Sequence, residues 1–207
     1  MATVVSICNL ALSRLGDVAS VSSIEPPDGS PQAEACRISY PMALGTILDM
    51  YNWSFATKRA TLALRGDVDP APWQYAYAVP ADCRRAINLE ETDATGEARS
   101  LTTDHPLEFE IATAQGGRVL LTNVKNPRLR YVEVDPPVGS FSSSFVDALS
   151  WLLASYLAGP KIRGGEAFNY AGYCMKYFQQ TYEQAIARDA RLTRVRPRHV
   201  APWIRGR

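Results

Sequence analysis

The residue types that most often do catalytic chemistry are sparse in this chain and lie far apart. Its two histidines, His105 and His199, have no neighbours at the spacing of a metal or catalytic motif. A serine cluster at 140–144 could supply a nucleophile, but serine before a helical pattern is a common helix N-cap, and we favour the cap. No metal or glycosidase spacing joins the carboxylates Asp17, Asp28, Asp49, Asp82 and the Glu90–Glu91 pair, although carboxylates distant in sequence can meet in a fold. We therefore expect no enzymatic activity, no cofactor and no metal.

An aromatic row is the second candidate for binding chemistry. Trp73, Tyr75 and Tyr77 alternate, which places them on one face of an expected strand, where they could stack on RNA bases. No lysine or arginine interleaves with them, whereas stacking platforms usually combine rings with cations. We favour packing inside a β domain for these rings.

The third candidate is the C-terminal segment 191–207, RLTRVRPRHVAPWIRGR. It contains an apolar trio flanked by arginines, and tryptophan and arginine are the residues that most often anchor protein interfaces. We predict an extended, flexible docking arm with Trp203 as its anchor, comprising Arg194, Arg196, Arg198, Pro202, Trp203, Ile204 and Arg205. In the alternative hypothesis the same arginines contact the phosphates of a nucleic acid.

Charge is distributed unevenly along the chain. The net charge is +1, but residues 188–207 carry seven arginines and one acid, whereas residues 1–187 carry 15 basic and 20 acidic residues. The chain is therefore an acidic body with a basic tail, and we expect the body to offer no basic face.

The cysteines and the longest apolar stretch indicate the redox environment of the protein and its relation to membranes. Cys8, Cys36, Cys83 and Cys174 are too widely spaced for a zinc motif, and we predict reduced core residues, with a disulfide pair as the alternative. The longest apolar stretch, 145–158, is 14 residues long and contains Asp147, so it is too short to span a bilayer. Because the first residues lack a basic leader, we expect no signal peptide and no membrane association.

The first part of the chain has helical periodicity. Apolar residues recur at helical spacing over 4–15, and Gly16 marks the end of that helix. Ser30 followed by Pro31 indicates the start of a second helix, in which Pro41 should cause a kink or a break.

The middle of the chain alternates with the period of strands. Short runs separated by turn residues predict a mainly antiparallel sheet, with Gly116 and Gly117 in a hairpin turn, and the runs are 57–64, 73–79, 84–90, 107–113, 117–122 and 128–134.

From position 141 the helical period returns. A serine-capped helix should end at Gly159–Pro160, and a last helix over about 165–191 has a stripe comprising Phe168, Ala171, Met175, Phe178, Tyr182, Ala185 and Ile186. We predict an α+β fold with a bundle of about four helices, two N-terminal and two C-terminal, and an inserted β domain. The expected division is 1–56 and 141–190 for the bundle, 57–140 for the β domain and 191–207 for the arm.

Several stretches together resemble a known family. They are ICNLALSRLG (7–16), YPMALGTILDMYNWSFATKRATLAL (40–64), WQYAYAVPADCRRAINL (73–89), LLTNVKNPRLRYVEV (120–134) and SFVDALSWLLASYLAGPKI (144–162). In this order they resemble the tail tubular protein A family, the head-to-tail adaptors of short-tailed bacteriophages. The likeness covers about residues 4–185, and the basic tail matches least well.

The resemblance implies a structural virion protein at the head-tail junction, present in the host cytoplasm before assembly. Such adaptors form a ring, usually of twelve subunits, between the portal protein and the tail (nozzle or tubular) protein, and they can remain monomeric until the portal is present. The ring continues the channel through which DNA leaves, without binding it specifically. The family fold is a helical bundle bearing a β domain.

Overall fold

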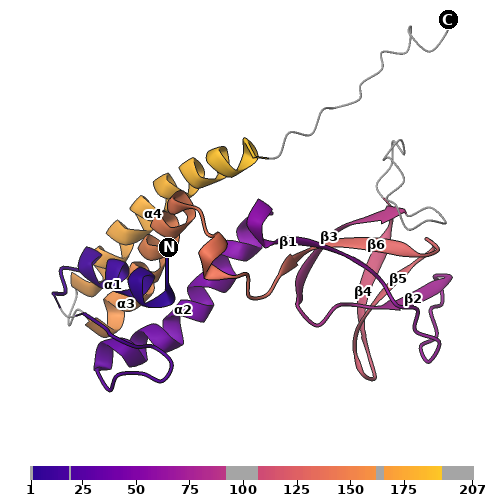
Figure 1. Cartoon of the computed structure of the whole chain (residues 1–207), viewed down its shortest axis with the longest axis horizontal. Helices are drawn as coiled ribbons and strands as arrows, with labels where there is room; N and C mark the ends of the chain where they lie inside the picture. Colours follow the sequence, from indigo (N-terminus) through magenta and orange to yellow (C-terminus); the bar gives the residue numbers. More distant parts are fainter. Residues whose placement is uncertain (1, 19, 92–106, 162–165, 193–207) are drawn as a thin grey trace, which may run out of the picture.

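The computed structural model describes residues 2–18, 20–91, 107–161 and 166–192 (Figure 1). In chain order the elements are α1 (Val4–Arg14), α2 (Pro31–Met50), η1 (Ser54–Ala56), β1 (Thr57–Thr61), β2 (Tyr75–Ala78), β3 (Cys83–Glu91), β4 (Phe109–Ala114), β5 (Gly117–Thr122), β6 (Pro127–Glu133), η2 (Val138–Ser140), α3 (Ser143–Lys161) and α4 (Glu166–Ala190). The α+β class is confirmed, because helices flank antiparallel strands in the described chain.

Helix α3 is the centre of the helical part, and α1, α2 and α4 all pack against it. Its sequence explains this position, since most of its described apolar residues are buried, including Phe145, Leu149, Leu152, Leu153 and Leu157. Helix α1 is also tied to α3 by charge. Arg14 pairs with Asp147, and its guanidinium lies 3.9 Å from the centre of the Trp151 ring.

The strands form two three-stranded sheets, with the orders β1-β6-β3 and β2-β5-β4, and every described pairing is antiparallel. We expected one sheet. The two sheets pack face to face through buried side chains from both, including Tyr77, Leu89, Leu120, Leu129 and Tyr131. Hairpin β4–β5 turns at Gly116 and Gly117, whose φ angles of 85° and 116° require glycine, as predicted.

Side chains fix the junction between helices and sheets. The buried indole of Trp53 donates to the carbonyl of Ile47 at 2.9 Å and stacks near Phe55 and Phe145. Further along, Arg84 at the start of β3 donates to both carboxylate oxygens of Asp49 at 2.7 and 2.6 Å. The sheets are therefore held against the C-terminal end of α2 by directional contacts as well as by apolar packing.

Three local expectations need correction. Helix α2 does not break at Pro41, because the neighbouring Tyr40, Ala43 and Leu44 are buried against the core and offset the one missing hydrogen bond, whereas the alternative of a kink stays a prediction. Helix α3 continues through Gly159–Pro160 to Lys161. Phe168 is 85% exposed, so the buried stripe of α4 begins only at Cys174, where α4 has packing partners.

All four cysteines are buried and none forms a disulfide, as predicted. Cys8 on α1 and Cys36 on α2 meet in the helical core, where a hydrogen bond to Cys36 and burial together raise the pKa of the Cys8 thiol. Across the described ranges, no helix combines the length and hydropathy that a membrane span requires.

Candidate functional site

The predicted arm residues lie outside the part of the chain that the structure describes. They are Arg194, Arg196, Arg198, Pro202, Trp203, Ile204 and Arg205, whereas the described chain runs to Leu192. Helix α4, which precedes the arm, has a buried anchor near its end. Asp189 is 5% exposed and accepts hydrogen bonds from the backbone N–H of Ser54 at 3.0 Å and from its hydroxyl at 2.6 Å.

The serine and histidine candidates do not assemble into an active site in the described structure. Ser142 caps α3 by accepting from the N–H of Phe145 at 3.2 Å, which confirms the cap. The Ser144 hydroxyl accepts from Arg188 at 3.2 Å. Both His105 and His199 lie outside the described residues.

The carboxylate candidates are engaged in structural contacts. Asp28 accepts from Ser22 and Ser30 in the loop before α2, and these hydrogen bonds, that from the Ser30 hydroxyl above all, lower its pKa. Asp49 pairs with Arg84, and Asp82 accepts from Tyr131 and Lys58. Within the described ranges no three His, Cys, Asp or Glu side chains are grouped as a metal site.

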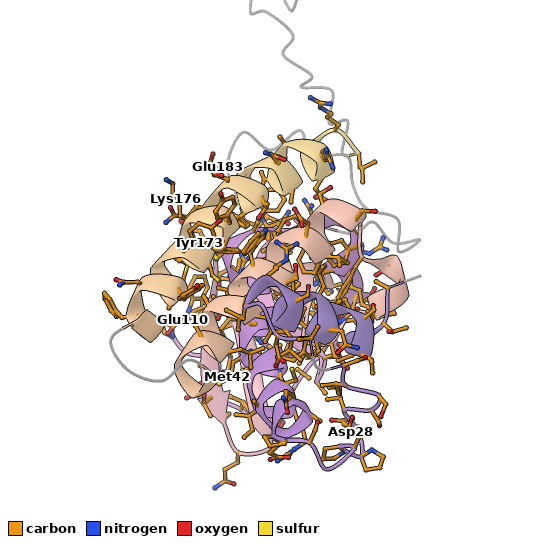
Figure 2. The ribbon with its side chains drawn as sticks, turned by 90° about the vertical axis from the view of Figure 1, so that its left-hand side faces the viewer. Asp28, Met42, Glu110, Tyr173, Lys176 and Glu183 are labelled. Atoms are coloured by element: carbon orange, nitrogen blue, oxygen red, sulfur yellow. The ribbon has the colours of Figure 1, made fainter. Side chains whose placement is uncertain are left out.

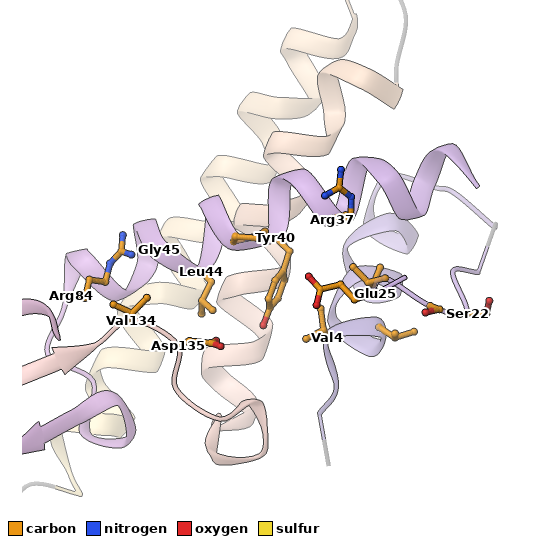
Figure 3. Close-up of a pocket in the computed structure, with 14 residues that line it drawn as sticks. Val4, Ser22, Glu25, Arg37, Tyr40, Leu44, Gly45, Arg84, Val134 and Asp135 are labelled. Atoms are coloured by element: carbon orange, nitrogen blue, oxygen red, sulfur yellow. The ribbon is translucent and has the colours of Figure 1, made fainter. Parts of the chain in front are cut away.

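A pocket of about 560 Å³ opens between α1, the loop before α2, α2 itself and the segment after β6 (Figure 3). Its walls are mostly apolar, with a few charged groups at the rim, and they include Val4, Ile24, Glu25, Tyr40, Leu44, Val134 and Asp135. The Tyr40 side chain is 8% exposed and its hydroxyl has no hydrogen-bond partner in the structure. Burial, with a smaller effect of Cys8 and Asp135, raises its pKa.

The chemistry of this pocket fits an apolar group with a polar end, since its charged lining residues include Arg37 and Arg84 as well as Glu25 and Asp135. Figure 3 shows the Tyr40 hydroxyl between the carboxylates of Asp135 and Glu25, neither of which forms an ion pair with a described residue. A buried hydroxyl without a partner is costly, and a ligand that bonded to it would remove this cost. Sequence reasoning missed the pocket because Tyr40 continues the apolar stripe of α2 and no local signal separates it from a core residue.

Two exposed apolar surfaces lie on the helices. The α2 surface consists of Ile38, Met42 and Met50, which are 55%, 63% and 49% exposed. The α4 surface consists of Tyr170 and Tyr173, which are 45% and 52% exposed. Phe168, which is 85% exposed, lies on another side of α4, because two residues turn an α-helix by about 200°. Figure 2 labels Met42 and Tyr173, which belong to different helices of the helical part. Since α2 and α4 each pack on α3, these are two separate surfaces of one subunit.

The expectation that the body lacks a basic face is wrong. Strand pairing gathers four arginines on the face of the β1-β6-β3 sheet that points away from the other sheet, namely Arg59, Arg85, Arg128 and Arg130. They come from three strands distant in sequence. The charge sum of the body could not show this local excess, because it counts the acidic residues of the whole body, whereas the one described carboxylate on this face is Glu90.

The aromatic row divides between two packing clusters. Tyr77 is 2% exposed and Tyr75 packs beside it between the two sheets. Trp73 precedes β2 and packs against the opposite face of the β2-β5-β4 sheet, near Val119 and Leu121. The packing interpretation is confirmed for Tyr75 and Tyr77, whereas the single face with Trp73 is wrong.

Comparison with known proteins adds no relative to this description. No family model and no curated protein matches the chain.

Proposed function

We propose that this protein is a structural virion component, a head-to-tail adaptor that forms a ring between the portal protein and the tail protein of a short-tailed bacteriophage. The proposal rests on the resemblance of residues 4–185 to that adaptor family. In this role the protein carries out no catalytic step and needs no cofactor. The ring, of about twelve subunits by resemblance, continues the DNA exit channel at the head-tail junction.

In this proposal the subunit consists of a helical bundle and a β domain held in a fixed orientation. Residues 1–56 and 141–190 form one bundle around α3, and residues 57–140 form an inserted β domain. The bidentate Arg84–Asp49 contact holds the β domain against the C-terminal end of α2, in one orientation relative to the helices. A rigid orientation suits a subunit that must match the same neighbours all around a ring.

The observation that best supports a ring is the pair of separate apolar surfaces on α2 and α4. A closed ring needs heterologous contacts, in which one surface of a subunit meets a different surface of the next. The α2 surface with its methionines and the α4 surface with its aromatic rings provide two such surfaces. Burying them between neighbours also accounts for large apolar side chains that a monomer would leave in water.

A substitution on the α2 surface tests this contact. Met42→Glu places a charge where a neighbour should pack, so the variant should remain folded but fail to enter rings formed with portal protein. Gln179→Glu, at an exposed position on α4 outside its apolar surface, is the matched control and should assemble normally. Normal assembly of Met42→Glu would remove the α2 surface from the interface.

The arm is proposed to dock onto the portal protein, with Trp203 as its anchor. Truncation after Arg191 should leave the unfolding transition of the body unchanged and abolish portal assembly. Trp203→Ala should weaken portal binding at least about tenfold, since buried tryptophans are frequent hot spots. Arg205→Gln, the control within the arm, should weaken it less. Portal binding retained after truncation would refute the docking role.

A nucleic-acid-binding module that uses the arm is the second candidate. The observation in its favour is charge, namely six net positive charges beyond residue 187. Duplex DNA binding with a steep dependence on salt, lost on truncation after Asp189, would support it over portal docking.

A further inference from the structure

The outer face of the β1-β6-β3 sheet carries a compact basic cluster, the arginine row, formed by Arg59, Arg128 and Arg130. Strand register sets its geometry. Arg59 on β1 and Asn88 on β3 lie directly opposite Arg130 on the central strand β6. Arg128, two residues along β6, lies opposite Thr61 and Glu90. Successive residues on one face of a strand are about 6.7 Å apart and adjacent strands about 4.8 Å apart, so the three guanidinium groups share one small area.

The arginine row is electrostatically unbalanced. Arg59 and Arg130 form a like-charged cross-strand pair, an arrangement that destabilises a sheet when nothing offsets it. Among the described residues of this area the one carboxylate is Glu90, which is 6% exposed and accepts from the Nε of Arg59 at 2.9 Å. Because β1 and β3 are the outer strands, this ion pair spans β6 and leaves Arg128 and Arg130 without a carboxylate among the described side chains.

Two buried polar atoms in the same area also lack partners. The Nε of Arg130 and the side-chain oxygen of Asn88, which are neighbours in the register, have no hydrogen bond in the structure. Buried polar groups are nearly always satisfied, and each exception calls for an explanation. A bound anion would accept from the Nε of Arg130 and offset the Arg59–Arg130 repulsion together. The Asn88 oxygen is itself an acceptor, so an anion does not satisfy it.

We propose that the arginine row binds the sugar-phosphate backbone of a nucleic acid. Arginine presents a planar fork of donors that matches phosphate oxygens, and the row contains no lysine. Arg128 and Arg130 follow one another on one face of β6, with Arg59 beside Arg130 on β1, and this close grouping of positive charges suits the closely repeated phosphates of a nucleic acid. Since the row itself holds no aromatic ring to stack on a base, the contact is independent of base sequence.

The site goes beyond the adaptor role, because it lies on the sheet and not on the arm or the helices. Binding to a labelled 20-base-pair duplex, measured with the full chain over a range of salt concentrations, tests it. Arg128→Gln/Arg130→Gln should reduce the slope of log affinity against log salt by about two, one for each phosphate that is no longer neutralised. The matched control, Arg37→Gln/Lys176→Gln, removes the same charge from the exposed surface of the helices and should leave the slope unchanged.

For a second variant we predict the opposite effect, tighter binding to the duplex. Glu90→Gln releases Arg59 from its ion pair with little change in shape, so duplex affinity should increase and the salt slope should steepen by about one. A gain of binding cannot come from failure to fold. Equal slopes for the arginine variant and its control, or weaker binding by Glu90→Gln, would overturn the proposal.

Polyglutamate of equal charge number distinguishes the class of partner. If it binds as tightly as the duplex and is weakened as much in Arg128→Gln/Arg130→Gln, the face recognises acidic protein and the phosphate assignment is wrong. Portal assembly separates this site from the adaptor role. Arg128→Gln/Arg130→Gln should still form rings with the portal protein. If this variant loses DNA binding but forms rings, the adaptor proposal is unaffected. If the unsubstituted protein binds DNA through the arginine row but forms no rings, the adaptor proposal is wrong and the DNA site remains.

Discussion

Asp189, in the last turn of α4, accepts two hydrogen bonds from Ser54, at 3.0 Å from the backbone N–H and 2.6 Å from the hydroxyl. A carboxylate at the C-terminal end of a helix is opposed by the helix dipole, so this position is unfavourable for α4 itself. The carboxylate instead connects α4 to η1, the segment where the chain passes from helices to sheets. The contact thus sets where the C-terminal segment leaves the body.

Replacing this carboxylate should destabilise the whole body. Asp189→Ala leaves the N–H and hydroxyl of the half-buried Ser54 without their acceptor, and we expect the free energy of unfolding to fall by about 2 kcal/mol. Ser54→Ala removes one donor only and should cost about 1 kcal/mol. Urea denaturation measures both. A loss below about 0.5 kcal/mol for Asp189→Ala would show that the connection is not structural.

Gly45 and Arg84 should be coupled. An added Cβ at Gly45 would lie 2.6 Å from Nη2 of Arg84, which pairs with Asp49. Gly45→Ala should therefore displace the guanidinium, and this loss should cancel most of the gain of about 0.5–1 kcal/mol that alanine brings to a helix interior. In an Arg84→Ala background the same change should show the full gain. A double-mutant cycle measures the coupling, and strict additivity would contradict the close approach.

The contacts of Asp82 predict a dependence of stability on pH. Burial acts to raise its pKa, but hydrogen bonds from Tyr131 and Lys58 outweigh this effect, so the pKa lies below its ordinary value. A depressed pKa in the folded state means that Asp82 stabilises the protein above the unfolded pKa of about 3.9, and that this contribution is lost as the pH falls through the folded pKa. The stability difference between the protein and Asp82→Asn should therefore shrink below about pH 4. A difference that stays constant to pH 2 would be inconsistent with the assignment.

The unpartnered hydroxyl of Tyr40 gives a prediction for the pocket. Tyr40→Phe removes a buried polar atom that makes no hydrogen bond, and we expect the free energy of unfolding to rise by about 1 kcal/mol. Thermal and urea unfolding measure the change. A decrease of similar size would show that the hydroxyl has a partner in solution.

Periodicity predicted the elements well and their assembly less well. The Ser30 cap with Pro31 and the boundaries of β5 depend on local chemistry, and the structure has both where expected. The division into two sheets and the arginine row depend on register between distant strands, which no local pattern carries. Phe168 is part of the buried stripe predicted for the last helix, but it is exposed. A helical stripe indicates which face of a helix is buried, but not how far along the helix its packing partners extend.

Assembly with portal protein tests the adaptor proposal most directly. Purified full-length protein should be mixed with the portal protein of the same phage and examined by negative-stain electron microscopy and light scattering. We predict a ring of about twelve copies stacked coaxially on the portal, whether or not the free protein is monomeric. Portal particles that never acquire the protein, over a range of concentrations and with the intact arm, would contradict the adaptor function.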